Sequence, residues 1–385
     1  MRRLQRRLRD ESGMTYVFVG FGFMAFLGAS MLAIDVGMLM TARNQAQNSA
    51  DEGALGGAVA LAFDDFDDRT PTGPAVTSAI TAATANQVMG ANVSVEPEDV
   101  EFPNDDEGQP TRVKVTAYRT AARNNPLSTL IAKYFAMPTA GVAATATAEA
   151  SVANAMTCVK PFTIPDKWDE KGQPPWDVND TYDAFDNKGN PLPPGTADVY
   201  IPATQSGYTG YNNIQNKGTR LVIRAGTGNN ITVSFYFSLA IAGETGGDEY
   251  EWNIANCNKH VMRWGDLLLQ EPGAMAGPTI HGIEDLIAKD PNAYWDESVN
   301  EVAGSEYPGQ SPRTFPIPLY DPAYYDEGKR NGRYADLKVA NWIGFFAEEV
   351  VGNQIWGRII PIAGIRDGST ETPDGLFPRA IRLVK

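Results

Sequence analysis

The sequence predicts an α+β protein in which a long apolar helix leads into a small helix-and-strand module and then into a larger β-rich domain. An uncharged run from Met14 to Ile34 indicates the helix. Alternating apolar and polar residues in 91–102 and 111–120 indicate strands of the module. After residue 157 the composition changes, because all seven Trp and 12 of the 15 Tyr follow it. Such a composition suits a β-rich domain with long ordered loops.

Four segments follow from these observations. Residues 1–13 form a basic tip, and residues 14–63 form the long helix. The stretch 64–75, DDFDDRTPTGPA, combines charge, Pro and Gly, so it ends the helix. Residues 64–156 make up the small module, and residues 157–385 make up the β-rich domain.

The charge of the chain is unevenly spread. Its 385 residues carry a formal net charge of −15, although the tip MRRLQRRLRDESG has five Arg against Asp10 and Glu11. The rest of the chain is therefore strongly acidic and would repel phosphates. This argues against nucleic acid as a partner.

The uncharged run is long enough to cross a membrane. At ~1.5 Å per residue it spans roughly 30 Å, the thickness of the hydrocarbon core of a bilayer. It offers no polar face beyond Gly, Ser and Thr, unlike a soluble helix. Basic flanks stay in the cytoplasm, so the Arg-rich tip predicts a single pass with the N-terminus inside and the rest outside.

A cleaved signal peptide is the alternative to a retained anchor. Small residues near the end of the run, Ala29, Ala33 and Gly37, leave cleavage open. The apolar core is nevertheless longer than the about 7–15 residues typical of signal peptides. We favour the retained anchor.

Asp35 follows the uncharged run directly, and apolar residues resume after it. One interpretation is that it marks the point where the helix leaves the hydrocarbon, where a carboxylate reaches water or headgroups. The other is that it lies within the bilayer and pairs with a cation of a neighbouring subunit. We favour the first interpretation.

Small residues recur every four positions along the helix. Such spacing allows two helices to approach closely, although simple alanine-driven helicity explains it equally well. The membrane half contains the row Ala25, Ala29, Ala33 and Gly37, and the half that follows contains Ala42, Ala46, Ala50, Ala54, Ala58 and Ala62.

The remaining elements are read from periodicity and turn residues. In the module we expect helices at 75–90 and 125–138, and strands at 91–102, 111–120 and 140–153. In the β-rich domain the clearest strands are 219–226, 230–241, 337–351 and 354–365, and 282–290 is a helix that runs into Pro291.

The two cysteines, Cys158 and Cys257, both fall in the part expected outside the cytoplasm. An oxidising compartment favours a disulfide between them, with two buried thiols as the alternative. Zinc bound by these cysteines with His260 and His281 is disfavoured, because the spacing offers only one C-x-x-H.

Other site chemistry is weakly indicated. The segment Asp177–Asn190 is rich in oxygen ligands but lacks the order of a calcium loop, so an Asx-rich turn is favoured over calcium. No nucleophile elbow, zinc-protease motif, P-loop or dinucleotide fingerprint is present. His260 and His281 could each serve as a general base with a Ser and an Asp, but the sequence does not identify these partners, so an ordinary surface or packed residue is favoured for each. We predict no enzyme, no cofactor and no metal.

One segment resembles a known family. Glu11 and Gly13, the element Ala33-Ile34-Asp35-Val36-Gly37, and a polar stretch after it are similar to the N-terminus of TadG-type proteins of the tight-adherence (Flp) pilus system. The likeness is dense over 10–62 and continues loosely to about 156. The stretches CVKPFTIPDKW, EPGAMAGPT and DPNAYWD look like the exported half of one TadG-like subgroup.

Two departures from related proteins matter. Pilins and TadE pseudopilins have a Glu five residues after the cleaved Gly, whereas Phe18 stands there in this chain. Cleavage after Gly13 is therefore left open. The D-x-S-x-S metal motif of some TadG-like proteins is also missing from this sequence.

The resemblance implies an anchored, non-enzymatic component of pilus assembly in the bacterial inner membrane, with its C-terminal domain periplasmic or extracellular. It would act as a minor pilin-like subunit or as an assembly factor at the filament base. Its partners would be pilin or pseudopilin helices, other Tad proteins and the membrane, and homo- or hetero-oligomers are compatible with this role. An anchored adhesin or glycan-binding protein is the alternative, and an anchored hydrolase is a third.

Overall fold

The computed structural model confirms the predicted fold class. A long apolar helix is followed by strand-rich structure that includes a closed sheet. The structure describes residues 12–172, 176–186, 188–226, 230–330, 336–368 and 375–384. The predicted basic tip lies almost entirely outside these residues.

The chain divides into two compact units, which are described separately. The first unit comprises residues 1–150 together with 382–385, and the second comprises residues 151–381. The division falls a few residues before the predicted boundary at 156, and the last residues of the chain return to the first unit.

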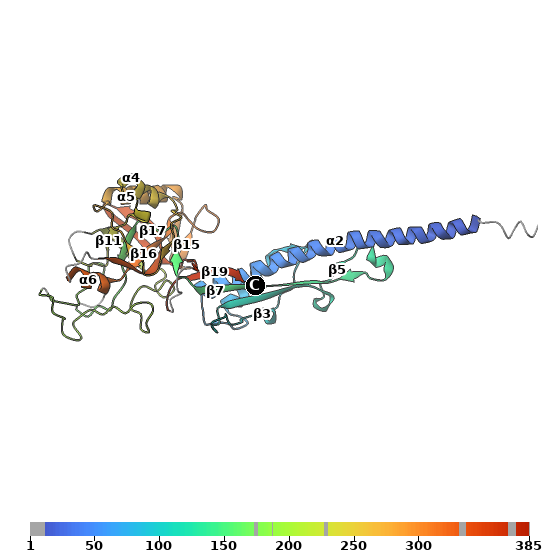
Figure 1. The fold of residues 1–385 in the computed structure, drawn as a ribbon, viewed down its shortest axis with the longest axis horizontal. Helices are drawn as coiled ribbons and strands as arrows, with labels where there is room; N and C mark the ends of the chain where they lie inside the picture. The colour runs from blue at the N-terminus through green and yellow to red at the C-terminus, as the bar shows by residue number, and fades with distance from the viewer. Residues whose placement is uncertain are drawn as a thin grey trace, which may run out of the picture. The chain divides into compact units, whose positions relative to one another are not determined.

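The first unit is built on helix α2 (Ser12–Phe63), which runs for 52 residues without interruption (Figure 1). Its sequence contains no Pro and is rich in Ala, Leu and Met, which favour helix. The helix ends at Phe63, where Asp65 turns the chain by accepting the backbone N–H groups of Asp67 and Asp68.

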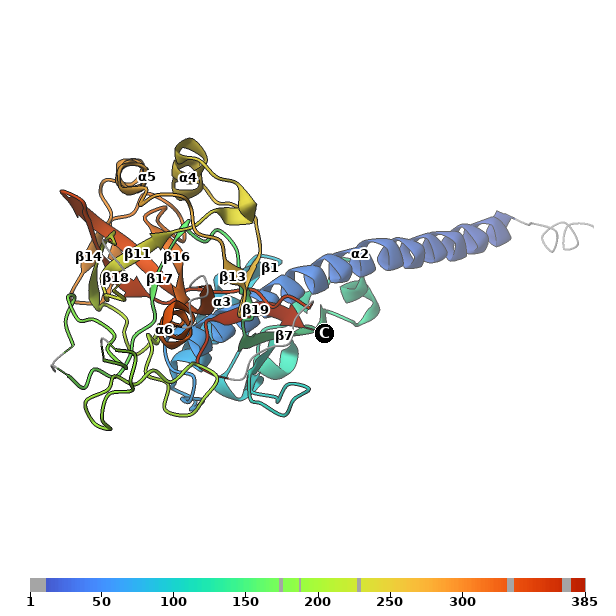
Figure 2. The same cartoon turned by 60° about the vertical axis from the view of Figure 1, so that its left-hand side comes forward.

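Helix α3 (Pro74–Ala85) packs against α2 (Figure 2). A four-stranded sheet, in the order β19-β7-β4-β3, completes this unit. The alternating burial of β4 reflects its alternating sequence, because successive side chains of a strand point to opposite faces. The strands of the sheet are β3 (Val100–Glu101), β4 (Arg112–Arg119), β7 (Val142–Val152) and β19 (Arg379–Val384).

Short elements connect these parts. Two strand pairs form small hairpins, β1 (Gln87–Val88) with β2 (Ala91–Asn92), and β5 (Leu127–Ser128) with β6 (Thr139–Ala140). The 3-10 turns are η1 (Pro97–Asp99), η2 (Ala121–Arg123) and η3 (Ala132–Phe135).

The second unit contains a sheet that closes on itself. Its order is β13-β17-β16-β9-β11-β10-β18, and β18 also pairs with the long strand β17. The strands are β9 (Phe162–Pro165), β10 (Arg220–Ala225), β11 (Phe235–Ser238), β13 (Leu267–Leu268), β16 (Thr314–Tyr320), β17 (Leu337–Val351) and β18 (Gln354–Ile360). The predicted strand at 230–241 is thus shorter than expected.

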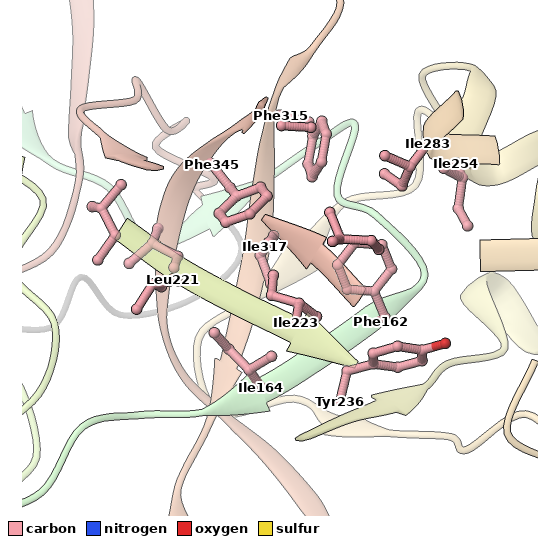
Figure 3. Packing of buried hydrophobic residues seen from close by; sticks show 14 of the residues in the cluster. Phe162, Ile164, Leu221, Ile223, Tyr236, Ile254, Ile283, Phe315, Ile317 and Phe345 are labelled. Atoms are coloured by element: carbon pink, nitrogen blue, oxygen red, sulfur yellow. The ribbon is translucent and has the colours of Figure 1, made fainter. Parts of the chain in front are cut away.

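Large apolar side chains fill the interior of this sheet (Figure 3). Phe162, Ile317 and Phe345 are fully buried. Gly357 allows the sheet to close, because a Cβ there would lie 2.2 Å from the carbonyl oxygen of Phe346. Burial of such side chains is the main stabilising contribution to a unit of this kind.

Helices and short strand pairs surround the closed sheet. Ile254 of α4 (Gly247–Ala255) and Ile283 of α5 (Ala276–Lys289) are buried in the same core. The other elements are β8 (Ala155–Met156), η4 (Ile241–Gly243), β12 (Met262–Arg263), β14 (Tyr294–Asp296), β15 (Glu301–Ala303) and α6 (Pro322–Arg330).

Candidate functional site

Asp35 is buried although it lies on the apolar half of α2. Its side chain is 4% exposed, whereas its neighbours Ile34 and Val36 are 46% and 39% exposed. A buried carboxylate is costly unless hydrogen-bond donors surround it. The burial of Asp35 therefore calls for partners.

The partners are backbone N–H groups of the same chain. Oδ1 of Asp35 accepts the N–H of Leu130 at 2.7 Å, and Oδ2 accepts those of Ile131 and Ala132 at 3.0 and 2.6 Å. These N–H groups stand at the start of turn η3, where no preceding turn supplies acceptors. Hydrogen bonds to a charged acceptor are roughly twice as strong as neutral ones. Neither this partner nor this arrangement is indicated by the sequence around Asp35.

The loop that Asp35 holds is the tip of the β5–β6 hairpin, which lies beside α2 (Figure 1). We call residues 129–138 the tip loop. Thr129 closes it, since its N–H donates to the carbonyl of Pro138 at 3.1 Å and its hydroxyl donates to that of Met137 at 2.6 Å. Ala136 adopts a left-handed conformation that ends η3. The loop therefore has a defined conformation.

The prediction of a helix at 125–138 was wrong. The segment forms a hairpin instead, with only the short turn η3 at its tip. Pro126 and Pro138 disfavour the helical conformation in the residues that precede them. Between them, Asp35 accepts the N–H groups of Leu130, Ile131 and Ala132, which stabilises the short turn at the tip.

The small residues of the membrane half of α2 are not covered by the first unit. Ala25, Ala29, Ala33 and Gly37 are all exposed within the structure. Ala33 lies two residues before Asp35 and Gly37 two residues after it, so both lie roughly 160° around the helix from Asp35. The face that carries Ala33 and Gly37 is thus left uncovered by the protein's own tip loop.

The small residues of the other half of α2 are covered by their own unit. Ala42, Ala46, Ala50, Ala54 and Ala58 are fully buried. The adjacent glycines allow close packing as well. A Cβ at Gly57 would lie 2.8 Å from Cγ1 of Val113 and 3.1 Å from Cβ of Ala79. The repeated spacing therefore reflects close approach in this half, and not helicity alone.

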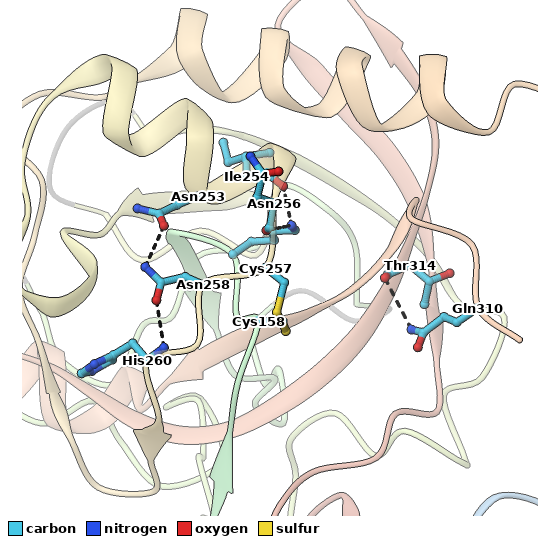
Figure 4. The surroundings of a disulfide bond; sticks show 10 residues. Cys158, Asn253, Ile254, Asn256, Cys257, Asn258, His260, Gln310 and Thr314 are labelled. Atoms are coloured by element: carbon cyan, nitrogen blue, oxygen red, sulfur yellow. Dashed lines mark hydrogen bonds between the residues drawn. A yellow bond between two sulfur atoms is a disulfide. The ribbon is translucent and has the colours of Figure 1, made fainter. Parts of the chain in front are cut away.

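The two cysteines are joined in the second unit (Figure 4). Their Cα atoms are 4.3 Å apart and 99 positions separate them in the sequence. The bond connects the segment before β9 to the segment after α4. Beside it, Nζ of Lys160 donates to the carbonyls of Ile254 and Asn256, and burial, with a contribution from Lys289, lowers the pKa of Lys160 to about 7. The bridge thus ties α4 to the closed sheet.

The remaining predicted residues do not assemble into a reactive site. His260 and His281 are exposed, and Nδ1 of His281 lies 3.8 Å from a carboxylate oxygen of Glu251. Within Asp177–Asn190, Asp177 and Asp186 accept nearby backbone N–H groups in Asx turns, and Asn187 lies outside the described residues. Among the described residues, no group of three or more His, Cys, Asp or Glu side chains is placed to hold a metal ion.

Asp166 is a buried carboxylate that the sequence analysis did not single out. The hydroxyls of Tyr200 and Tyr208 donate to it at 3.0 and 2.7 Å, and the N–H groups of Lys167 and Tyr211 donate at 2.9 Å. Burial raises the pKa of Asp166 to about 6 despite these donors. All its contacts connect segments of the second unit, which indicates a structural role.

These features define a class of protein. In the described part of the chain, α2 is the one helix long and apolar enough to cross a membrane, and its apolar window is not buried by the protein. The chain is therefore a candidate membrane-anchored protein whose anchor continues into a folded unit.

Comparison with known families gives a more specific assignment for the N-terminal helix. Residues 13–60 match the model of the Flp pilus-assembly TadE/G-like family, Tad. The match confirms the resemblance of the N-terminal segment to the TadE/G-like family, which supports involvement in Tad/Flp pilus assembly. Comparison with the curated proteins and with the solved structures gives no match.

Proposed function

We propose that the protein is a non-enzymatic, membrane-anchored component of the pilus assembly machinery that acts through helix packing. It would serve as a minor pilin-like subunit or as an assembly factor at the base of the filament. Its partners are pilin or pseudopilin helices, which would pack on the uncovered face of the membrane half of α2. Close packing of small residues is a main source of helix association in lipid.

One observation carries the proposal. The residues matched by the family model, 13–60, are those of α2, and only the second half of this helix has its small residues buried by its own unit. The exposed row Ala25, Ala29, Ala33 and Gly37 is chemically equivalent but has no partner within the unit. A partner helix in the membrane would use it in the same way.

The proposed topology places the anchor in the bacterial inner membrane, with the N-terminus in the cytoplasm and both units outside it. The Arg-rich tip supports this orientation. A reporter that is active only outside the cytoplasm should work when fused after Lys385 and fail when fused before Met1. The opposite result would overturn the topology.

A deletion strain tests the function itself. Cells without this chain should lose pili, and the full-length protein should restore them. Normal pili in the deletion strain would reject the role in assembly. Loss of adhesion to glycan surfaces in cells whose pili are normal would instead favour the alternative of an adhesin.

A further inference from the structure

We propose that the tip loop is a second membrane contact, whose exposed apolar side chains enter the interfacial layer of the bilayer that α2 crosses. The proposal rests on the membrane anchor of the proposed function and adds a contact to it. Four side chains of the loop would make this contact: Leu130, Tyr134, Phe135 and Met137.

Asp35 sets the depth of the loop. The uncharged run of α2 ends at Ile34, and its length matches the hydrocarbon core of a bilayer. Asp35 is the next residue and is hydrogen-bonded to three successive N–H groups at the start of the loop. The loop is therefore held at the level where the helix leaves the hydrocarbon.

The side chains that the loop presents are unusually apolar for an exposed surface. Tyr134 is 77% exposed, Leu130 is 52%, Met137 is 49% and Phe135 is 40% exposed. Grouped large apolar side chains on a surface mark contact with a partner or a membrane. Their position beside the end of a membrane span makes the bilayer the partner that is necessarily within reach.

The polar chemistry of the loop fits the interfacial layer. Nζ of Lys133 lies 5.3 Å from the centre of the Tyr134 ring. Aromatic side chains with a polar end are enriched at membrane interfaces, and lysine extends its ammonium group to the headgroups there. The phosphates of phospholipids would complement Lys133.

The backbone hydrogen bonds of the tip loop also suit the interfacial layer of the bilayer. Unpaired N–H groups are costly near lipid because no water is present to replace the missing partner. Asp35 satisfies three of them, while Thr129 and Met137 pair across the loop with Pro138 and Ala132. In return the loop satisfies the carboxylate at the edge of the bilayer.

The contact would orient the anchor as well as strengthen it. A single helix rotates freely about its axis in a membrane, but a second contact on one side fixes the rotation. Since Ala33 and Gly37 lie roughly 160° around the helix from Asp35, the loop would hold their face turned away from itself. Partner helices would then meet Ala33 and Gly37.

Spin labels in the full-length protein test this proposal. The protein is reconstituted in vesicles of phosphatidylethanolamine with a minority of phosphatidylglycerol, and a nitroxide is attached at Tyr134→Cys. Its collision rates with oxygen and with a water-soluble nickel chelate report contact with lipid. Thr81→Cys, exposed on α3 of the same unit, is the matched control in water. Phe21→Cys, exposed within the apolar run, is the control in the hydrocarbon.

The ratio of oxygen to nickel collisions at residue 134 should exceed that at residue 81 several-fold and lie between the values at 81 and 21. A value at 134 equal to that at 81, with residue 21 in lipid, would overturn the loop contact and leave the anchor intact. Shielding of residue 134 only after pilin is added would also overturn it and assign the loop to a protein partner. A water-exposed label at residue 21 would reject the anchor itself, and the loop contact with it.

Discussion

The two units of this protein are stabilised by different means. In the first unit, small residues let α2 approach α3 and β4 so closely that a Cβ at Gly57 would not fit. In the second, a closed sheet buries large side chains such as Phe162 and Phe345, and a disulfide ties α4 to it. The anchor helix is thus part of the first unit, and the second unit has a core of its own. Because of this difference, we expect that substitutions can destabilise one unit without affecting the other.

The largest expected effect is on the second unit. Cys158→Ser opens a loop of about 100 residues, which should lower the free energy of unfolding of this unit by about 2–4 kcal/mol. All seven Trp lie in this unit, so tryptophan fluorescence during denaturation of the full chain in detergent follows it selectively. Cys257→Ser and the double variant should behave identically. An unchanged transition in all three variants would contradict the stabilising role of the bridge.

The next effect should appear in the first unit alone. Gly57→Leu forces a side chain against Val113 and Ala79, which should cost about 1–3 kcal/mol of stability. Limited proteolysis of α3 and β4 measures the loss, while the tryptophan transition of the second unit should not move. Gly20→Leu is the matched control, because a Cβ there has no neighbour within 4 Å. Equal effects of the two substitutions would show that close packing does not hold this unit.

An effect confined to a few residues is expected at the tip loop. Asp35→Asn replaces the charged acceptor of three N–H groups by an amide and should weaken the contact by about 1.5–3 kcal/mol. Hydrogen exchange of the amides of Leu130, Ile131 and Ala132 should then become roughly tenfold to a hundredfold faster. Asp51→Asn in the same helix should leave these amides unchanged. If exchange is unchanged in Asp35→Asn, Asp35 does not hold the tip loop and only marks the point where the helix leaves the membrane.

The smallest effect on stability is expected in the membrane half of α2. Ala33→Leu should leave both units folded, because Ala33 is exposed, but it should reduce the number of pili by filling the space that a partner helix needs. Gly28→Leu adds bulk on another face of the helix, roughly 140° around the axis from Ala33. It should leave piliation normal. Counting pili on complemented deletion cells measures the difference. Full piliation in Ala33→Leu would argue against packing on this face.

The sequence predicted the features that depend on neighbours along the chain. The uninterrupted helix, its end at Phe63 and the strand at 337–351 followed from periodicity and from turn residues. The pairing of Cys158 with Cys257 was expected because both cysteines fall in the part predicted to lie outside the cytoplasm, where an oxidising compartment favours a disulfide.

Contacts between residues that are distant in the sequence could not be predicted from local sequence patterns. Asp35 meets Leu130 across 95 positions, and no local pattern shows that a carboxylate will take backbone N–H groups as partners. The segment 125–138 was predicted to be a short helix bounded by prolines, whereas it forms a hairpin whose tip exposes its apolar side chains. Asp35 follows an apolar run, and the next cation in the sequence, Arg43, lies about two helical turns further on. This isolation of the carboxylate was a signal that its partners lay elsewhere.

Site-specific photo-crosslinking in piliated cells tests the central claim most directly. A photoreactive residue placed at Ala33 should form an adduct with a pilin or pseudopilin. The same residue at Gly28, on the face of Asp35, or at Asn48, exposed in the half of α2 that packs within its own unit, should not. Adducts of equal yield at all three positions, or no adduct at Ala33 in cells that make pili, would contradict the claim that this face of the anchor binds partner helices.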